Sequence, residues 1–580
     1  MNENAAGGDA GLPGERGARM SFRNSRRGFL AGGAVLLLLV LAVYSPAIRG
    51  GYIWDDDEYV THNSNLASAD GLRRIWLEPR SNPQYYPLVF SSFWVERHLW
   101  GLNPLGYHLV NVLLHALNAI LLWHLLRRLS LSGAWLAAAI FALHPVHVES
   151  VAWITERKNV LSAALYLGAA VSYLRFAGGT QAAEKTAEAP ARRRFAYALA
   201  LALFGGALLA KSITASLPAA LLLVAWWRRG RIGWGDVAPL LPLFLMGAVF
   251  GLHTAYLEKN HVGALGPDWD FTALQRCLIA GRVPWFYAGK LLWPDPLIFF
   301  YPRWQVDAAE LRNYFFPLGA VALVALLWTR RRQGRGALTA VLFFIGTLVP
   351  VSGFFNFFPM RFSFVADHFQ YLASIGPIAL FCGALGRRLS SPPPRRAGFL
   401  APVAAAALLL VLATLSWRQC RTYASEETLW RTTLAQNPGA FIAHDNLGVL
   451  LDKQGHLLEA KSHFEQVLKI KPDFANTYFN LGAVLGKLGN ADGARAVYAE
   501  ALRLRPLYAE AHNNLGILYA TRGELAAARY HFEMALRIKP GLAVTHRNLG
   551  IVLGKLGLQA EAETHFQQAR TLPSDDSGQR

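Results

Sequence analysis

Long apolar stretches recur along most of the chain, and polar sequence with helical periodicity fills the remainder. Residues 29–48 carry no acidic or basic side chain, and about twenty such residues are the length that an α-helix needs to cross a bilayer. Comparable stretches continue as far as residue 416. The pattern predicts an all-α protein in which a multi-pass membrane domain at 29–417 precedes a water-exposed helical domain.

The apolar stretches predict about eleven membrane-spanning helices. They lie at 29–48 and near 105–126, 133–147, 159–176, 195–210, 212–227, 238–254, 311–328, 337–351, 372–386 and 398–416. Segment 273–293 contains Arg276, Arg282 and Lys290, which are costly in hydrocarbon, so we expect it to be interfacial or re-entrant. A cleaved signal peptide is the alternative for 29–48, but further spans follow and no small-residue cleavage site is evident.

The charge of the chain helps to orient these spans. The protein has 580 residues, of which 53% are hydrophobic, and a net charge of +19. Nucleic-acid binding and basic cytoplasmic loops both explain such an excess. Arginines gather at alternate helix ends, at Arg127, Arg128, Arg228, Arg229, Arg330, Arg331, Arg332, Arg387, Arg388, Arg395 and Arg396. We therefore predict an inner-membrane protein with no nucleic-acid partner, a basic cytoplasmic segment at 1–28, and a periplasmic C-terminal domain.

The C-terminal domain, 425–573, is built from repeats. Pro438, Pro472, Pro506 and Pro540 are 34 residues apart, and an Asn-Leu-Gly triplet recurs at the same spacing. A small alanine and an aromatic residue follow at fixed offsets, as in the paired helices of tetratricopeptide repeats. We predict four full repeats that stack into an α-solenoid, with a partial repeat before them and a polar tail at 574–580. The full repeats are 438–471, 472–505, 506–539 and 540–573.

One asparagine per repeat forms a predicted ladder along the inner helices, namely Asn446, Asn480, Asn514 and Asn548. They are either the polar inner face of the solenoid or hydrogen-bonding groups for the backbone of an extended peptide. Similar ladders occur in the repeats of the O-GlcNAc transferase family. Both interpretations stay open, and the second makes the groove a binding site for an acceptor peptide.

Candidate catalytic groups lie in the loops that the topology places outside. Asp55 and Asp56 follow the first span and precede aromatic, proline-rich sequence. A solvated acidic run is the simplest interpretation of these carboxylates. A carboxylate held at the bilayer surface is also suited to act as a general base toward a lipid-linked substrate.

The second outward loop, 142–162, is dense in polar groups. His144, His147 and Glu149 suggest a metal site, but Pro145 breaks the helix that an HExxH motif requires. We therefore expect no metal, and a polar or substrate-contact role for these residues and for Glu156, Arg157 and Lys158 of the same loop. Further along the chain, Lys211 occupies a tight hairpin, and the last outward loop holds Arg361, Asp367, His368 and Tyr371. Cations in these loops are either interfacial anchors or ligands for a donor phosphate.

Together these motifs resemble the transmembrane and tetratricopeptide-repeat O-mannosyltransferases and their bacterial relatives, which have the glycosyltransferase-C fold. The resemblance runs from Ala47 to the end of the repeats. It rests on Asp55-Asp56 with Asn63, on the loop HPVHVESVAWITERKNVLS, on the Lys211-Ser212 hairpin, and on ADHFQYLAS. The chain departs from many eukaryotic members at 156–159 and at Asp367-His368.

The resemblance implies an inverting transfer of a sugar, typically mannose, from a polyprenyl phosphate to Ser or Thr hydroxyls of exported proteins. Asp55 or Asp56 would then be the general base, and Lys211, Arg361 and His368 would bind the donor phosphate. His144, His147, Glu149, Arg157, Asp367 and Tyr371 would orient donor or acceptor, and the repeats would bind the acceptor.

Two other functions remain compatible with the sequence. One is transfer of a polyprenyl-linked sugar to a glycan or lipid, and the other is a non-enzymatic scaffold that assembles an envelope complex. The sequence has no GxGxxG fingerprint and no P-loop, so we expect no nucleotide-binding domain. We expect no cofactor beyond the lipid-linked sugar as co-substrate, and dependence on a divalent metal is left open.

Overall fold

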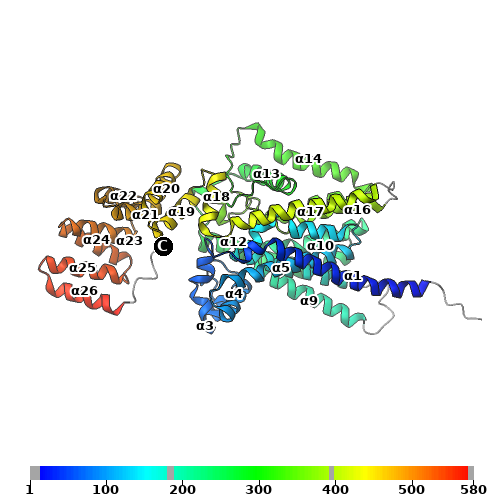
Figure 1. Ribbon diagram of the computed structural model, residues 1–580, viewed down its shortest axis with the longest axis horizontal. Helices are drawn as coiled ribbons and strands as arrows, with labels where there is room; N and C mark the ends of the chain where they lie inside the picture. Colours follow the sequence, from blue (N-terminus) through cyan, green and yellow to red (C-terminus); the bar gives the residue numbers. More distant parts are fainter. Residues whose placement is uncertain (1–13, 179–188, 391–396, 573–580) are drawn as a thin grey trace, which may run out of the picture. The chain divides into compact units, whose positions relative to one another are not determined.

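A computed structural model shows a chain made of helices and connecting loops (Figure 1). It describes residues 14–178, 189–390 and 397–572, and no β-strand occurs in these ranges. The chain divides into two compact units, Met1–Thr428 and Leu429–Arg580. The all-α fold predicted from the apolar pattern is confirmed. The polar tail, the first part of the basic N-terminal segment, and Arg395 and Arg396 lie outside the described residues.

The first unit holds the apolar helices. The longer ones are α1 (Gly14–Val43), α5 (Pro104–Arg128), α8 (Arg157–Ala177), α9 (Ala189–Ala210), α10 (Leu217–Arg229), α12 (Leu241–Leu257), α13 (Ala273–Leu292), α14 (Phe315–Thr329), α15 (Gly336–Leu348), α16 (Ile375–Ser390) and α17 (Ala397–Thr422). The shorter ones are α2 (Ser45–Ile48), α3 (Ala69–Leu77), α4 (Pro87–Trp100), α6 (Ala134–Leu143), α7 (Val148–Ala152) and α11 (Trp234–Val237). Helix α18 (Glu426–Gln436) contains the division between the two units.

Seven described helices are long and apolar enough to cross a membrane, and a bent pair, α6 with 145–152, would make eight. The predicted spans at 212–227, 337–351 and 372–386 fall on α10, α15 and α16, which have 13, 13 and 16 residues. At 1.5 Å per residue these helices are about 20–24 Å long, which is less than the roughly 30 Å of hydrocarbon. Eleven spans therefore remain a prediction, whereas a multi-pass membrane domain is supported.

The segment at 273–293 forms α13, which is not one of the seven. Its cations have partners in neighbouring loops. The guanidinium of Arg276 donates to the carbonyl oxygen of Gly353 at 2.9 Å, and the ammonium of Lys290 donates to that of Pro296 at 2.5 Å. Arg282 lies over the ring of Trp304, 4.4 Å from its centroid. These contacts provide the polar surroundings that cations in an apolar helix require.

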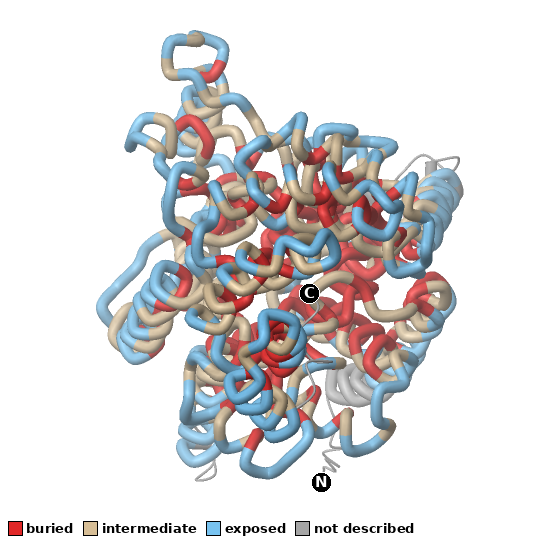
Figure 2. The backbone as a smooth tube through the Cα atoms, turned by 90° about the vertical axis from the view of Figure 1, so that its left-hand side faces the viewer, coloured by how far each residue is buried: buried red, intermediate tan, exposed pale blue. Residues whose placement is uncertain are grey.

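Helices α5 and α8 form the interior of the first unit, and α8 packs along both α5 and α9. In the most apolar stretch of α5, 50% of the residues are buried, and in that of α8, 56% are buried. The corresponding shares are 6% for α14 and 11% for α17. The peripheral helices therefore present apolar surface outward, as a lipid-facing helix does. Figure 2 colours the backbone by burial, with buried segments toward the interior and exposed ones along the periphery.

The second unit contains the predicted helix pairs. They are α19 (Phe441–Lys453) with α20 (Leu457–Ile470), α21 (Ala475–Lys487) with α22 (Ala491–Leu504), α23 (Ala509–Thr521) with α24 (Leu525–Ile538), and α25 (Ala543–Lys555) with α26 (Gln559–Thr571). Glycine allows the two helices of a pair to approach. A Cβ atom on Gly482 would lie 2.6 Å from the ring of Tyr498, and one on Gly448 2.7 Å from that of Phe464. The tetratricopeptide architecture is confirmed.

Candidate functional site

Asp56 is fully buried and ties two segments of the first unit together. Its Oδ2 atom accepts a hydrogen bond from the backbone N–H of Ile53 at 2.9 Å. Its Oδ1 atom accepts from the backbone N–H and the hydroxyl of Thr155, at 2.8 and 2.6 Å. Burial raises the pKa of Asp56 to about 7, against the lowering effect of the Thr155 hydrogen bonds. Asp56 therefore fixes the loop that carries its neighbour, Asp55.

Asp55 has a different environment. Within the described part of the chain, its buried Oδ1 atom has no hydrogen-bond partner. Burial raises the pKa of Asp55 well above its ordinary value, Asp56 and Glu156 raise it further, and the charge of Lys158 lowers it. A buried carboxylate oxygen without a donor is available to a substrate hydroxyl, so Asp55 is the stronger candidate for the general base.

Aromatic rings enclose the backbone at Asp55. Trp54, which precedes it, has a φ of 47°, in the left-handed region that non-glycine residues rarely adopt. Its ring stacks on Trp153 with 5.5 Å between centroids, and meets Phe299 and Phe300 edge-on at 5.5 and 5.3 Å. These contacts hold the strained residue and give the carboxylate apolar surroundings, consistent with its raised pKa.

Glu156 is the centre of a buried cluster of charges. The segment 154–156, a 3₁₀ turn before α8, places its carboxylate between the side chains of Lys158, Lys211 and His368. Its Oε1 atom is 2.9 Å from Nζ of Lys158, and its Oε2 atom is 3.5 Å from Nζ of Lys211. The Nε2 atom of His368 lies 3.9 Å from Oε1. The cluster thus joins the start of α8, the hairpin before α10, and the turn at 367–370.

Asn159 connects the members of this cluster. Its amide nitrogen donates to Oε2 of Glu156 at 2.5 Å and to the backbone carbonyl oxygen of His368 at 3.1 Å. Its amide oxygen accepts from Nζ of Lys211 at 2.7 Å. Because Asn159 lies one turn after Glu156 on the same helical segment, both groups point toward the same side, and one bidentate amide links an anion to a cation.

The last loop completes the cluster. The backbone N–H of His368 donates to Oε2 of Glu149 at 2.9 Å, and Nδ1 of His368 lies 3.1 Å from Oε1. Asp367 accepts from the hydroxyl of Tyr301, with 3.0 Å to each carboxylate oxygen. Burial raises the pKa of Asp367 well above its ordinary value, and the charge of Glu149 adds to this. The structure therefore brings Glu149, Lys211 and His368 together, and Asp367 directly precedes His368 in the sequence.

Other candidates are tied to structural partners outside the cluster. The guanidinium of Arg157 is fully buried, forms an ion pair with Glu96, and donates to the amide oxygen of Asn111. His144 hydrogen-bonds to the backbone carbonyl of Leu291, and His147 to the backbone carbonyl of Phe141 and the hydroxyl of Ser374. The hydroxyl of Tyr371 hydrogen-bonds to the side chains of His115 and Asn118. These contacts join elements of the fold, and the substrate-orienting roles of these four residues stay predictions.

Arg361 also lies apart from Glu156. Its Nε atom is 3.7 Å from a carboxylate oxygen of Asp268, and its guanidinium lies over the rings of Trp269, Phe358 and Phe362, 5.4–5.7 Å from their centroids. The expected donation of Arg361 to a donor phosphate therefore has no geometric support. Among the residues that the structure describes, no group of three or more His, Cys, Asp and Glu side chains is arranged to hold a metal ion.

The asparagine ladder of the repeats makes internal hydrogen bonds. The amide nitrogen of Asn446 donates to the carbonyl of Ile442 at 2.8 Å, that of Asn514 to the Tyr498 hydroxyl at 3.1 Å, and that of Asn548 to Asn513 at 3.3 Å. Asn480 interacts with the carboxylate of Asp445. All four residues are half-buried. They form part of the inner polar face, and a bound peptide would have to compete with these contacts.

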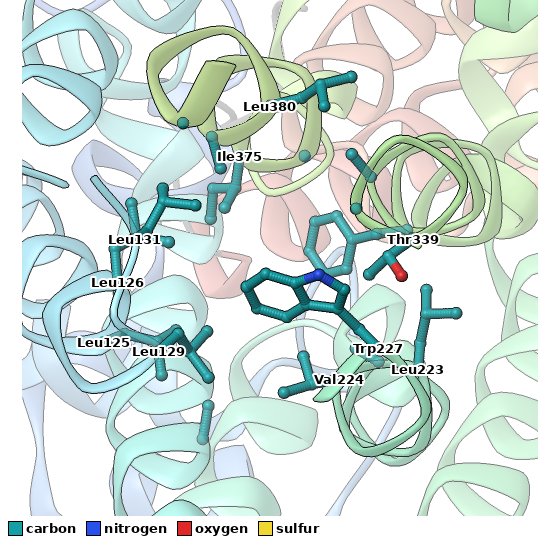
Figure 3. A pocket seen from close by; sticks show the side chains of 18 of the residues that line it. Leu125, Leu126, Leu129, Leu131, Leu223, Val224, Trp227, Thr339, Ile375 and Leu380 are labelled. Atoms are coloured by element: carbon teal, nitrogen blue, oxygen red, sulfur yellow. The ribbon is translucent and has the colours of Figure 1, made fainter. Parts of the chain in front are cut away.

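A cavity of about 150 Å³ lies inside the first unit, between α5, α8, α10, α15 and α16. Figure 3 shows its lining, where leucines of α5, α10 and α16 surround the indole of Trp227. Its lining is apolar except at a few positions, such as Tyr166 and Arg387. Leu217, which directly follows the turn after Lys211, and Ile375, which begins the helix after His368, both belong to it.

The sequence pattern does not single out Thr155 or Asn159, whereas Glu156 and Lys158 are among the charged residues of the loop that it highlights. All four lie in the loop HPVHVESVAWITERKNVLS, so the available signal was the density of polar groups between two apolar stretches. The two histidines and Arg157 of the same loop have partners outside the cluster around Glu156. Only the folded chain separates the two groups.

Comparisons with known proteins agree with this architecture. The tetratricopeptide-repeat family model matches residues 443–474 and 479–543. Human protein O-mannosyl-transferase TMTC1 is 24% identical over 526 residues, covering 79% of this chain and 58% of its own. Protein O-mannosyl-transferase F38B6.6 of Caenorhabditis elegans is 24% identical over 484 residues, covering 80% of this chain and 65% of its own. The chain is therefore similar to transmembrane and tetratricopeptide-repeat O-mannosyltransferases over most of its length.

The similarity to this family extends through both units, because the two long alignments cover about four fifths of the chain. The chain spans less than two thirds of the length of these two relatives, 58% and 65%. Drosophila melanogaster Tmtc1 matches a shorter stretch of 157 residues at 34% identity, 25% of this chain and 18% of its own. Among solved structures, the MamA protein matches with a TM-score of 0.24 and 24% identity, covering 25% of this chain and 79% of its own.

Proposed function

We propose that this protein transfers mannose from a polyprenyl-phosphate donor to Ser or Thr hydroxyls of exported proteins, with inversion at the anomeric carbon. The observation that carries the proposal is the buried Oδ1 atom of Asp55, which has no partner in the described chain and lies near the charge of Lys158. A base without a donor beside a set of cations is the combination that glycosyl transfer from a phosphate requires. The names of the relatives, protein O-mannosyl-transferases, support the same reaction class.

In this reaction, Asp55 and the residues around Glu156 have separate roles. Asp55 accepts the proton of the acceptor hydroxyl as its oxygen attacks the anomeric carbon from the face opposite the phosphate. The bond between the anomeric carbon and the phosphate oxygen breaks, and the charge that develops on this oxygen is stabilised by cations. The ammonium groups of Lys158 and Lys211 and the imidazole of His368 all lie around Glu156, so we assign the phosphate to these three residues.

A lipid-linked donor is supported by the apolar cavity between α5, α8, α10, α15 and α16 (Figure 3). Its lining begins at Leu217 and Ile375, on the helices that follow Lys211 and His368 in the chain, and extends along these helices to Trp227 and Arg387. Isoprenoid and acyl chains are stabilised by such surroundings because they leave no polar group unsatisfied.

The remaining assignments concern the acceptor and the cell. We propose that the solenoid binds the exported acceptor, as stacked repeats form extended concave surfaces. We place the protein in the bacterial inner membrane, with basic loops in the cytoplasm and the Asp55 loop and repeats in the periplasm, following the arginine distribution. Activity needs no cofactor in this proposal, since the lipid carries the sugar.

Comparative glycoproteomics of bacterial strains tests the proposal. The four strains carry the wild-type gene, a deletion, the Asp55→Asn variant, or the Asp57→Asn variant. Asp57 is the matched control because its carboxylate accepts a hydrogen bond from the hydroxyl of Thr61. We expect hexose on periplasmic Ser or Thr peptides in the wild-type and Asp57→Asn strains, and its loss in the other two. Removal of a general base typically costs about 10²–10⁴ in rate.

Two results would overturn this assignment. Glycopeptides that persist in the deletion strain would exclude the protein as their transferase. Glycopeptides that persist in the Asp55→Asn strain alone would exclude Asp55 as the base. Loss of hexose from an envelope glycolipid, with glycopeptides intact, would instead identify a glycan or lipid acceptor.

A further inference from the structure

Glu156 is 1% exposed, yet it is surrounded mostly by side chains that carry or accept positive charge. Lys158, Lys211 and His368 approach its two carboxylate oxygens from three different elements. A buried carboxylate at such a place is costly unless it is paired. A neutral residue in place of Glu156 would leave Lys158 and Lys211 buried without this partner.

Lys211 is the cation whose state depends most on its neighbours. The charged groups that act on it are Glu156, Lys158 and Glu149. Its Nζ atom also donates to the Asn159 amide oxygen at 2.7 Å and lies 6.0 Å from the centroid of the Phe369 ring. Glu149 itself is engaged by His368, so Glu156 is the carboxylate in direct contact with Lys211.

We propose that Glu156 is a positioning residue that keeps Lys211 charged and oriented, together with Lys158, for the phosphate of the lipid-linked donor. This inference rests on the proposed function and adds a group that does not itself touch the donor. Asn159 holds the Glu156 carboxylate at 2.5 Å and Lys211 at 2.7 Å, so the amide fixes the anion and the cation relative to each other.

The physical reason is the burial of Lys211. Burial lowers the pKa of Lys211 to about 8, and the charge of Glu156 is the largest effect that raises it. An opposite charge at this range shifts a pKa by about 1–3 units. Without Glu156, the ammonium of Lys211 would lose its proton near or below neutral pH, and a neutral amine does not stabilise a departing phosphate.

Binding of undecaprenyl phosphate to the full chain in detergent tests this inference. For wild type we expect binding to weaken above a pH of about 8, as Lys211 loses its proton. For Glu156→Gln we expect the same loss at a pH about 1–3 units lower. At pH 8 the variant should bind roughly tenfold more weakly than wild type, because one charge-assisted hydrogen bond is missing.

A second variant separates positioning from folding. Glu156→Gln combined with Asn159→Asp exchanges the amide and the carboxylate across their 2.5 Å contact, and leaves a carboxylate beside Lys211. We expect this double variant to restore the wild-type pH midpoint, at least in part. A purely structural role of Glu156 predicts no such recovery, because the packing is disturbed twice.

The outcomes distinguish this inference from the proposed function. If wild type neither binds the probe nor transfers sugar, the proposed function fails. If wild type binds and transfers, but Glu156→Gln keeps the wild-type pH midpoint, the role of Glu156 is wrong and the function stands. A shifted midpoint that the exchange variant leaves unrestored also overturns positioning by charge.

Discussion

The neighbouring carboxylates of Asp55 and Asp56 differ in their hydrogen bonding. Both carboxylate oxygens of Asp56 accept hydrogen bonds, from Ile53 and Thr155. The buried Oδ1 atom of Asp55 has no hydrogen-bond donor in the described chain. Hydrogen bonds to a carboxylate stabilise its charged form and restrict it, and an unbonded oxygen is free to accept a proton. The pair thus combines a structural anchor with a candidate base one residue apart.

The charge of Lys158 is expected to set the pH dependence of the reaction. Lys158 lowers the pKa of Asp55, against burial, which raises it. In Lys158→Met the pKa of Asp55 therefore rises further, and more base is protonated at a given pH. We expect the acidic limb of kcat/KM to move to higher pH by about one unit or more, apart from any loss of overall rate. An unchanged midpoint would show that Asp55 is not the base.

Arg157 gives a stability prediction at the same scale. Arg157→Met leaves Glu96 buried without its ion pair, and such a loss typically costs about 3–5 kcal/mol. The exposed pair of Arg229 and Asp236 provides the control, since the Arg229 side chain is 55% exposed and Arg229→Met should cost less than about 1 kcal/mol. Thermal unfolding in detergent compares the two, and equal effects would contradict a structural role for Arg157.

At the scale of elements, the outward loop at 142–162 shows how a broken helix builds a site. Pro145 ends the run of α6, and the chain continues through two short turns around α7 before α8 begins at Arg157. With these breaks, Thr155 donates to Asp56, while Glu149 and Glu156 both lie beside His368. The proline predicted the break, but not the directions that follow it.

The repeats permit a matched test within one helix, α21. Gly482→Ala places a Cβ atom 2.6 Å from the buried ring of Tyr498, whereas a Cβ on Gly486 meets no atom within 4 Å. We expect Gly482→Ala to destabilise the solenoid by about 1–3 kcal/mol through overpacking. Gly486→Ala should be neutral or stabilising by up to ~1 kcal/mol. Limited proteolysis during a thermal ramp measures both, and equal midpoints would contradict the close packing.

At the scale of the whole molecule, the orientation of the chain is open to direct measurement. Cys277 is exposed, and Cys382 and Cys420 are buried, so Cys277→Ser gives a background with little thiol reactivity. In that background we expect Thr571→Cys, in the repeats, to react with a membrane-impermeant maleimide in intact spheroplasts. Gln333→Cys, beside the arginine cluster, should react only after permeabilisation. The reverse pattern would invert the topology.

The sequence by itself determined the architecture, because hydrophobic runs and a 34-residue period report directly on burial in lipid and on repeated packing. It also indicated the loops that hold the site. Only the tertiary structure decided which of their polar residues meet, since Glu156, Lys211 and His368 come from segments that are far apart in the chain. The family resemblance implied roles for Arg157 and Arg361, and only the structure shows that Arg157 pairs with Glu96 and Arg361 with Asp268. Directions of side chains after broken helices depend on long-range contacts, which no local pattern encodes.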